Sequence, residues 1–150
     1  MMLLRAVLDR AFAERRRLPA PSAARCLALF AVETGGCGGC GVELAALGGA
    51  AWDGAACGFE RASTPADADV LLVTGALTRS MAPVLERAWH AMPGPRALVA
   101  VGACAIDGGP FGETYATLGG LAGRAVSDVA VPGCPPSPDA IRAVLLTLLS

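Results

Sequence analysis

The fold is decided by the stretch CLALFAVETGGCGGCGVELAAL, which runs from Cys26 to Leu47. Its first part, up to Val32, is a continuous apolar run, which is typical of a strand buried on both faces of a parallel sheet. A glycine-rich loop with two cysteines follows, and the pattern from about Val42 to Leu47 predicts a short helix. A strand, a loop and a helix in succession form the unit from which α/β folds are built.

The same unit recurs along the rest of the chain. Further strands are predicted at Asp69–Gly75, Ala97–Cys104 and Asp128–Cys134, with a weaker one at Cys57–Ala62. Helices are predicted at Met81–His90, near Glu113–Leu121 and from about Pro138 to Leu149. Because strands alternate with helices, we expect an α/β fold with a mostly parallel, doubly wound, flavodoxin-like sheet.

The chain divides into two parts. Apolar residues at helical spacing within 2–17, followed by the linker LPAPSAA, predict an N-terminal amphipathic helix and linker over residues 1–25. The remainder, residues 26–150, is long enough to form one domain with its own core.

Charge and hydropathy exclude several classes of function. The net charge is −1 and no basic stripe with aromatic residues is present, so we expect no nucleic-acid partner. No apolar run reaches the length of a membrane span, and the N-terminus lacks the features of a secretory signal. We therefore expect a cytoplasmic chain, in which the six cysteines stay reduced and are available as ligands.

Four of the cysteines share one position relative to the predicted strands. Cys37 and Cys40 follow the first strand, while Cys104 and Cys134 each come at the end of a later strand. Because the carboxyl ends of parallel strands form the edge at which ligands bind, we expect these four thiols to converge there. Their loops are rich in glycine, which lets the backbone approach a bulky ligand closely.

Four thiolates are a ligand set for either an iron–sulfur cluster or a structural zinc ion. Zinc sites usually take two close cysteine pairs, whereas here only Cys37 and Cys40 are close in sequence. We therefore favour an iron–sulfur cluster and keep zinc as the alternative. A third interpretation treats Cys37 and Cys40 as a redox-active dithiol before a helix, which leaves Cys104 and Cys134 unexplained.

Four stretches together resemble a known family: TGGCGGCGVELAAL, ADVLLVTGALT, VAVGACAIDGGPF and VPGCPPSPDAI. In this order they are similar to the B subunit of complex I and to the small subunits of membrane-bound, energy-converting nickel–iron hydrogenases. The resemblance covers about residues 26–149. It implies a flavodoxin-like electron-transfer domain with one 4Fe-4S cluster, similar to centre N2, whose ligands would be Cys37, Cys40, Cys104 and Cys134.

The spacing of the first pair indicates a branch of this family. The complex I members have adjacent cysteines, whereas two glycines separate Cys37 from Cys40 here, as in the formate hydrogenlyase-like branch. The resemblance thus implies a subunit of a membrane-associated group 4 hydrogenase-like complex. The alternative is the B subunit of a complex I-type NADH-quinone oxidoreductase.

The resemblance also implies partners and a location. These are a large subunit, of nickel–iron or complex I-like type, a ferredoxin-like cluster subunit, and membrane subunits near the N-terminal helix. The location is peripheral, on the cytoplasmic face of the inner membrane. Two positions depart from the family pattern: Ser137 replaces an arginine of the PGCPPRP box, and Asp139 stands where glutamate is common. Loss of the arginine removes a charge-assisted contact that the family pattern offers for docking against the large subunit or for tuning the cluster potential.

Other residues have simpler interpretations. Cys26 is expected in the core, Cys57 as a non-ligand and His90 at the surface. Glu43 is expected to benefit from a helix N-terminus, although by resemblance it could assist proton movement at a subunit interface. We assign Asp107 to loop structure, and Trp52 and Trp89 to packing or partner contact. The sequence has neither a nucleophile–base pair nor a nucleotide-binding motif.

Overall fold

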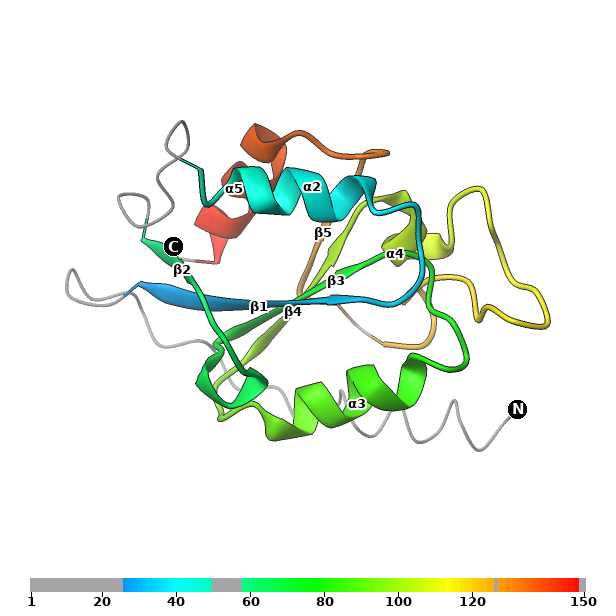
Figure 1. The fold of residues 1–150 in the computed structure, drawn as a ribbon, viewed down its shortest axis with the longest axis horizontal. Coiled ribbons are helices and arrows are strands. Elements are labelled where there is room, and N and C mark those ends of the chain that lie inside the picture. Colours follow the sequence, from blue (N-terminus) through cyan, green and yellow to red (C-terminus); the bar gives the residue numbers. More distant parts are fainter. Residues whose placement is uncertain (1–25, 50–57, 126, 149–150) are drawn as a thin grey trace.

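The computed structural model describes residues 26–49, 58–125 and 127–148, and Figure 1 shows their arrangement. Within these ranges the strands form one sheet of five, all parallel, in the order β2-β1-β3-β4-β5. The strands are β1 (Leu27–Glu33), β2 (Phe59–Arg61), β3 (Val70–Thr74), β4 (Ala97–Val101) and β5 (Val129–Val131). This is the flavodoxin-like order, so the predicted fold class is confirmed.

Helices cover both faces of the sheet. The helical segments are α2 (Gly39–Ala46), the short 3₁₀ helix η1 (Pro65–Asp67), α3 (Ala82–Ala91), α4 (Ala103–Asp107) and α5 (Pro138–Thr147). In Figure 1, α3 lies against one face, while α2 and α5 lie together against the other. This placement makes a three-layer α/β domain.

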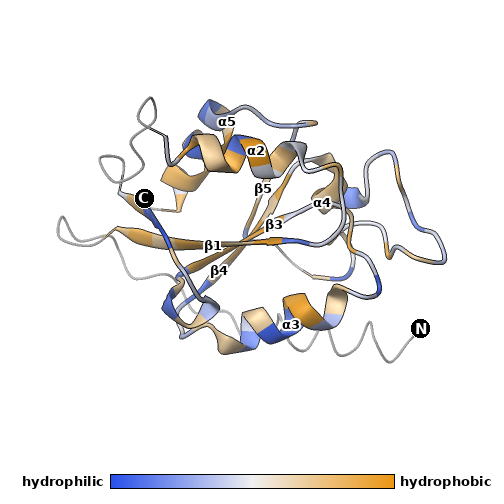
Figure 2. Ribbon diagram, in the orientation of Figure 1, coloured by the Kyte–Doolittle hydropathy of each residue, from blue (hydrophilic) through white to orange (hydrophobic). Residues whose placement is uncertain are grey.

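The two central strands form the centre of the core. Every residue of β3 and β4 is buried, and Figure 2 shows these strands as mainly hydrophobic. Alternate side chains point to opposite faces, so Leu71 packs in the cluster that contains Trp89 of α3, whereas Leu72 packs in the cluster that contains Ile141 of α5. Continuous apolar runs therefore became strands covered on both sides.

Two aspartates join neighbouring strands at the amino edge of the sheet. Asp69 precedes β3, and its carboxylate accepts a 3.0 Å hydrogen bond from the Ala28 N–H of β1. Asp128 precedes β5, and its carboxylate accepts a 2.8 Å bond from the Leu98 N–H of β4. Each carboxylate thus bonds the second residue of the adjacent strand, which supports the observed register.

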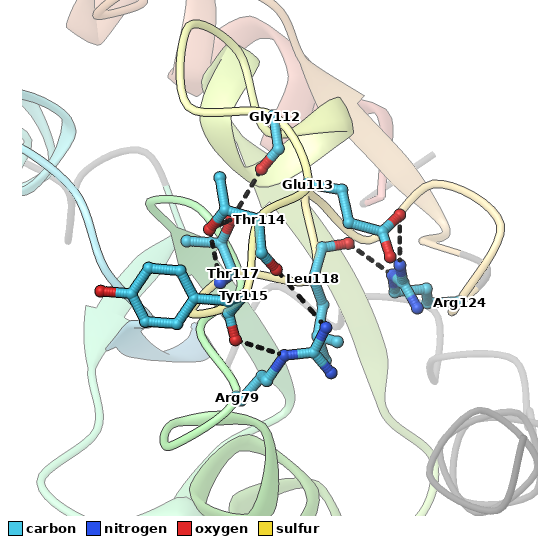
Figure 3. Close-up of polar contacts among 8 residues, drawn as sticks. All are labelled: Arg79, Gly112, Glu113, Thr114, Tyr115, Thr117, Leu118 and Arg124. Atoms are coloured by element: carbon cyan, nitrogen blue, oxygen red, sulfur yellow. Dashed lines mark hydrogen bonds and ion pairs between the residues drawn. The ribbon is translucent and has the colours of Figure 1, made fainter. Parts of the chain in front are cut away.

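The helix predicted near Glu113–Leu121 is wrong. The segment is a loop with isolated antiparallel bridges that pair Thr78 with Thr117 and Glu113 with Leu118. Its carbonyl groups bond to side chains from elsewhere, as Figure 3 shows: the Arg79 side chain donates to the Tyr115 carbonyl at 2.8 Å. These contacts compete with helical backbone bonds, and glycines on both sides of the segment favour a loop.

The same loop is closed by a second arginine. The Arg124 Nε donates to the Leu118 carbonyl at 2.6 Å, and its guanidinium lies 3.0 Å from the Glu113 carboxylate (Figure 3). The Thr117 hydroxyl donates to the Gly112 carbonyl at 2.7 Å. The loop is therefore ordered by side-chain contacts rather than by a repeating backbone pattern.

Element boundaries differ from the predictions mainly at the carboxyl edge. The strand predicted at Ala97–Cys104 ends at Val101, and the unpredicted helix α4 follows between Gly102 and Gly108. Helix α2 begins at Gly39, before the predicted start at Val42. The N-terminal helix and linker, Trp52 and Cys57 lie outside the described residues. Among the helices that the structure describes, none is long and apolar enough to cross a membrane.

Candidate functional site

The four predicted ligand cysteines all lie beyond the carboxyl ends of strands. Cys37 is in the loop between β1 and α2, and Cys40 is the second residue of α2. Cys104 is the second residue of α4, directly after β4, and Cys134 is in the loop between β5 and α5. Two of the four thiols are thus on the first turns of helices that begin at this edge.

The thiols are close enough to affect one another's ionisation. Burial raises the pKa of the Cys40 thiol, and the negative charges of Cys104, Cys37 and Cys134 raise it further, together with that of Glu33. The structure therefore brings the thiols of Cys37, Cys104 and Cys134 into electrostatic range of Cys40.

Cys104 shows the same pattern. Burial raises the pKa of its thiol first, and the charges of Cys134, Cys37 and Asp107 add to this, while its own backbone N–H has an opposing effect. In the chain by itself, the charges of neighbouring thiolates thus disfavour the ionised forms of Cys40 and Cys104. A bound cation or cationic cluster would reverse this preference by favouring the thiolate form.

Exposure increases across the site from its inner to its outer side. Cys104 is 8% exposed and packs at the end of the core. Cys40 is half-buried, and Cys37 and Cys134 are exposed. A group held between them would be covered by the domain on one side and open on the other.

Glycines lie against three of the four sulfurs. A Cβ atom built on Gly102 would lie 2.6 Å from the Cys40 Sγ, and one built on Gly109 would lie 3.1 Å from the Cys104 Sγ. A Cβ built on Gly39 would be 3.4 Å from the Cys37 Sγ. The glycines near the cysteines thus leave the sulfur atoms the space that a side chain at these positions would occupy.

Backbone bonds tie the cysteine loops together. The Gly102 N–H donates to the Val131 carbonyl at 2.8 Å, and the Ala103 N–H donates to the Gly133 carbonyl at the same distance. These two bonds extend the pairing of β4 and β5 beyond the strands. They hold the segment before Cys104 against the segment before Cys134.

Thr34 supports the first cysteine loop and was missed by the sequence analysis. It is fully buried, and its hydroxyl lies 3.0 Å from the Thr74 carbonyl and 3.1 Å from the Gly75 carbonyl. The Thr34 carbonyl in turn accepts a 2.6 Å bond from the Thr78 hydroxyl. A threonine directly before the glycine–cysteine loop was the available signal, although its partners lie about forty residues away.

The remaining candidate residues have structural positions. Cys26 lies at the amino end of β1, on the opposite edge from the four thiols, and is half-buried. His90 is exposed near the end of α3, 4.0 Å from the Glu86 carboxylate. Trp89 is 1% exposed, and the Arg96 guanidinium stacks over its ring at 4.5 Å. The packing interpretation of Trp89 and the surface interpretation of His90 are therefore confirmed.

Three polar residues near the cysteines also take defined positions. Asp107, which was predicted in a loop, is instead the last residue of α4, and its carboxylate accepts a 2.8 Å bond from the Gly109 N–H in the turn that follows. Ser137 is the N-cap of α5, and its hydroxyl accepts a bond from the Ala140 N–H at 3.3 Å. Glu43 lies beyond the first turn of α2, so the predicted interaction with the helix N-terminus is wrong, because α2 begins at Gly39.

The four cysteines are a suitable ligand set for an iron–sulfur cluster or a structural zinc ion. Soft thiolates are the protein ligands of iron–sulfur clusters and of structural zinc, and the glycine contacts keep the space beside the sulfurs free. Among residues 26–49, 58–125 and 127–148, no group of three or more His, Cys, Asp or Glu side chains is already arranged to hold a metal ion. The structure therefore places the thiols at one edge without a closed ligand shell.

Residues 37–148, which include all four cysteines, match the model of a family described as NADH ubiquinone oxidoreductase, 20 Kd subunit. The chain belongs to this family. Family membership agrees with the predicted resemblance.

Two named relatives are similar to this chain over two thirds to three quarters of its length. The NADH-quinone oxidoreductase B subunit of Bacteroides thetaiotaomicron is 49% identical over 102 residues, which are 67% of this chain and 52% of that protein. The F(420)H(2) dehydrogenase B subunit of Methanosarcina mazei is 41% identical over 112 residues, 75% of this chain and 60% of that protein. The chain thus spans between half and two thirds of the length of these relatives.

Solved structures share the fold. A chain of the membrane-bound sulfane sulfur reductase, an archaeal respiratory membrane complex, has a TM-score of 0.73 at 28% identity, covering 83% of this chain and 69% of that one. A chain of an NAD+-reducing nickel–iron hydrogenase has a TM-score of 0.65 at 22% identity, covering 83% of this chain and 92% of that one. At this lower identity the likeness concerns the fold alone.

Proposed function

We propose that this chain is an electron-transfer subunit of a membrane-associated oxidoreductase complex, and that Cys37, Cys40, Cys104 and Cys134 hold one 4Fe-4S cluster. The observation that carries the proposal is that four thiols from three separate loops lie at the carboxyl edge, where the charges of the neighbouring thiolates raise the pKa of Cys40 and of Cys104. When bound, such a cluster supplies a one-electron carrier. The sequence offers no nucleophile–base pair, so the contribution of the chain is to hold and tune that carrier.

The residues of this chain would tune the site in two ways. Burial of Cys104 keeps water from the inner side, and the exposed Cys37 and Cys134 leave the outer side open toward a partner. Burial and nearby charge are the main influences that a protein has on an iron–sulfur potential. The Glu33 and Asp107 carboxylates add negative charge near Cys40 and Cys104, which favours the oxidised, less negative state of a cluster.

A structural zinc ion is the alternative with the same ligands. Against it stands the placement of the cysteines on a scaffold that has its own buried core, with fully buried central strands independent of the thiol edge. Structural zinc typically supplies folding energy to domains that lack such a core. The zinc interpretation would make the chain a scaffold without electron transfer.

Two kinds of complex fit the proposal. The Gly-Gly spacing between Cys37 and Cys40 favours a group 4 hydrogenase-like complex, in which the large subunit carries a nickel–iron site. The 49% identity to a protein named as an NADH-quinone oxidoreductase component favours a complex I-type enzyme that passes electrons to quinone. The companion large subunit separates them: two CxxC pairs able to hold nickel indicate the hydrogenase type, and their absence indicates the quinone type.

The proposed partners and location follow from the same reasoning. They are the large subunit, a ferredoxin-like cluster subunit and membrane subunits, with the complex on the cytoplasmic face of the inner membrane. Ser137 caps α5 with its hydroxyl where the family pattern has an arginine, so this chain would dock or tune without that guanidinium. Whole-complex purification followed by identification of its subunits tests this assignment.

Metal and sulfide analysis tests the proposed cluster. The anaerobically purified protein is expected to contain about four iron and four acid-labile sulfide per chain. Low-temperature EPR of the reduced protein is then expected to show one cluster signal. Stoichiometric zinc without acid-labile sulfide would contradict the proposal and support the scaffold alternative.

A further inference from the structure

Gly102 occupies a position at which three of the cysteine-bearing segments meet. It is the N-cap of α4, two residues before Cys104, and a Cβ built on it would lie 2.6 Å from the Cys40 Sγ of α2. The same atom would lie 3.5 Å from the Gly133 carbonyl oxygen and 3.7 Å from the Pro136 Cδ, which flank Cys134. Gly102 therefore adjoins two cysteine-bearing loops besides its own. By contrast, the nearest atoms to a Cβ built on Gly39 belong to Cys37 in its own loop and to Pro135.

The backbone of Gly102 is also one that only glycine adopts readily. Its φ of 88° and ψ of 159° fall in a region that L-residues with a Cβ avoid. This conformation directs the Gly102 N–H to the Val131 carbonyl, while the next N–H, from Ala103, bonds the Gly133 carbonyl. The position that a Cβ atom of residue 102 would take points toward the Cys40 sulfur.

We infer that Gly102 is a positioning residue for the thiol site: its missing side chain lets the Cys40 sulfur reach the point between the ends of β4 and β5. The inference rests on the proposed cluster only for its consequence, because the contact exists in the chain without a cluster. A methyl group at this position would push the Cys40 sulfur away from Cys104 and Cys134. The chain would then keep its sheet but present a distorted set of four ligands.

A double-mutant cycle in the cluster-free whole chain tests the contact. The melting temperature is measured for Gly102→Ala, Cys40→Ala and the combined variant. If the methyl group collides with the sulfur, the loss caused by Gly102→Ala falls to roughly half or less when Cys40 is alanine. An equal loss in both backgrounds overturns the inference, and so does failure of both the single and the combined variant to fold.

Gly119→Ala is the matched control for backbone strain. Gly119 has a φ of 84°, close to that of Gly102, but a Cβ there would meet only the Asp107 carbonyl oxygen at an ordinary 3.5 Å. This variant therefore also carries a positive-φ penalty but does not touch a sulfur. Its melting temperature is expected to fall by the same amount whether Cys40 is present or is alanine.

Cluster loading tests the consequence. After reconstitution with iron and sulfide, Gly102→Ala is expected to lose most of its iron per folded chain or to show a shifted EPR spectrum, whereas Gly119→Ala keeps the wild-type spectrum. A wild-type spectrum in Gly102→Ala overturns the positioning role. If the unaltered chain itself takes up no iron and sulfide, the proposed function fails, and the double-mutant cycle still decides whether Gly102 positions Cys40.

Discussion

At the amino edge of the sheet, the carboxylates of Asp69 and Asp128 each accept a hydrogen bond from the backbone of a neighbouring strand. At the carboxyl edge, Cys40 and Cys104 lie within electrostatic range of each other and of the remaining two thiols, and their pKa values are raised. The first edge satisfies its polar groups within the chain. The second gathers soft donors that repel one another when ionised.

This difference separates the residues that hold the fold from those that we propose to hold a ligand. Carboxylates that bond backbone N–H groups fix strand pairing and need nothing from outside. Thiols that disfavour one another's ionised form become compatible when a cationic group is bound between them. The comparison therefore predicts that changes at the amino edge lower stability, whereas changes to the thiols alter ligand binding.

The largest stability effect is expected at Asp69. Its side chain is 4% exposed, so Asp69→Ala leaves the Ala28 N–H buried without this acceptor. We expect the free energy of unfolding to fall by about 1–3 kcal/mol, measured by urea denaturation with circular dichroism. The iron content per folded chain should stay unchanged.

The control for Asp69 is Asp67→Ala. Asp67 is exposed, and its carboxylate accepts a 2.7 Å bond from the exposed Thr64 hydroxyl, so the effect of its loss is expected within about 0.5 kcal/mol of zero. Equal effects of the two aspartate variants would show that the buried bond from the Ala28 N–H to Asp69 does not stabilise the fold.

Asp128 makes the same kind of bond between strands, but in a more exposed position. Its carboxylate bonds the Leu98 N–H at 2.8 Å, but the side chain is exposed, so water can replace it. Asp128→Ala is expected to lower the free energy of unfolding by about 0.5–1.5 kcal/mol, less than Asp69→Ala in the same denaturation experiment. A larger loss at Asp128 than at Asp69 would show that burial does not set the size of the effect.

The smallest effect is expected at Ser137, on the carboxyl edge. Its hydroxyl caps α5 through a 3.3 Å bond from the Ala140 N–H in an exposed position. Ser137→Ala is expected to cost about 0.5 kcal/mol, at the low end for N-caps, in thermal or urea unfolding. Ser137→Arg, which restores the residue of the family pattern, should lose the same cap, and exposed Ser63→Ala should have no measurable effect.

The central part of the fold could be predicted because its signals are local. The apolar runs of β3 and β4 are continuous, since these strands are covered on both faces, and the positions of α3 and α5 follow from helical spacing. Helix α4 was missed because five residues are too few to show a period. The helix predicted near Glu113–Leu121 was wrong because Arg79 and Thr78, distant in sequence, organise that segment as a loop.

The site was predictable in outline only. Parallel-strand topology alone places Cys37, Cys40, Cys104 and Cys134 at one edge, and the structure brings them into mutual electrostatic range. The contact between Gly102 and the Cys40 sulfur could not be predicted, because it joins two loops whose relative position depends on the packed sheet. The role of Thr34 was hidden for the same reason.

The most direct test of the account is the low-temperature EPR spectrum of the reduced protein, with its iron and sulfide content, for single cysteine variants. Cys104→Ser and Cys134→Ser are each expected to abolish or strongly alter the cluster signal. Cys26→Ser, at the amino end of β1, and Cys57→Ser are expected to leave it intact. An unchanged signal and unchanged iron content in Cys134→Ser would contradict the assignment of the four thiols to one cluster.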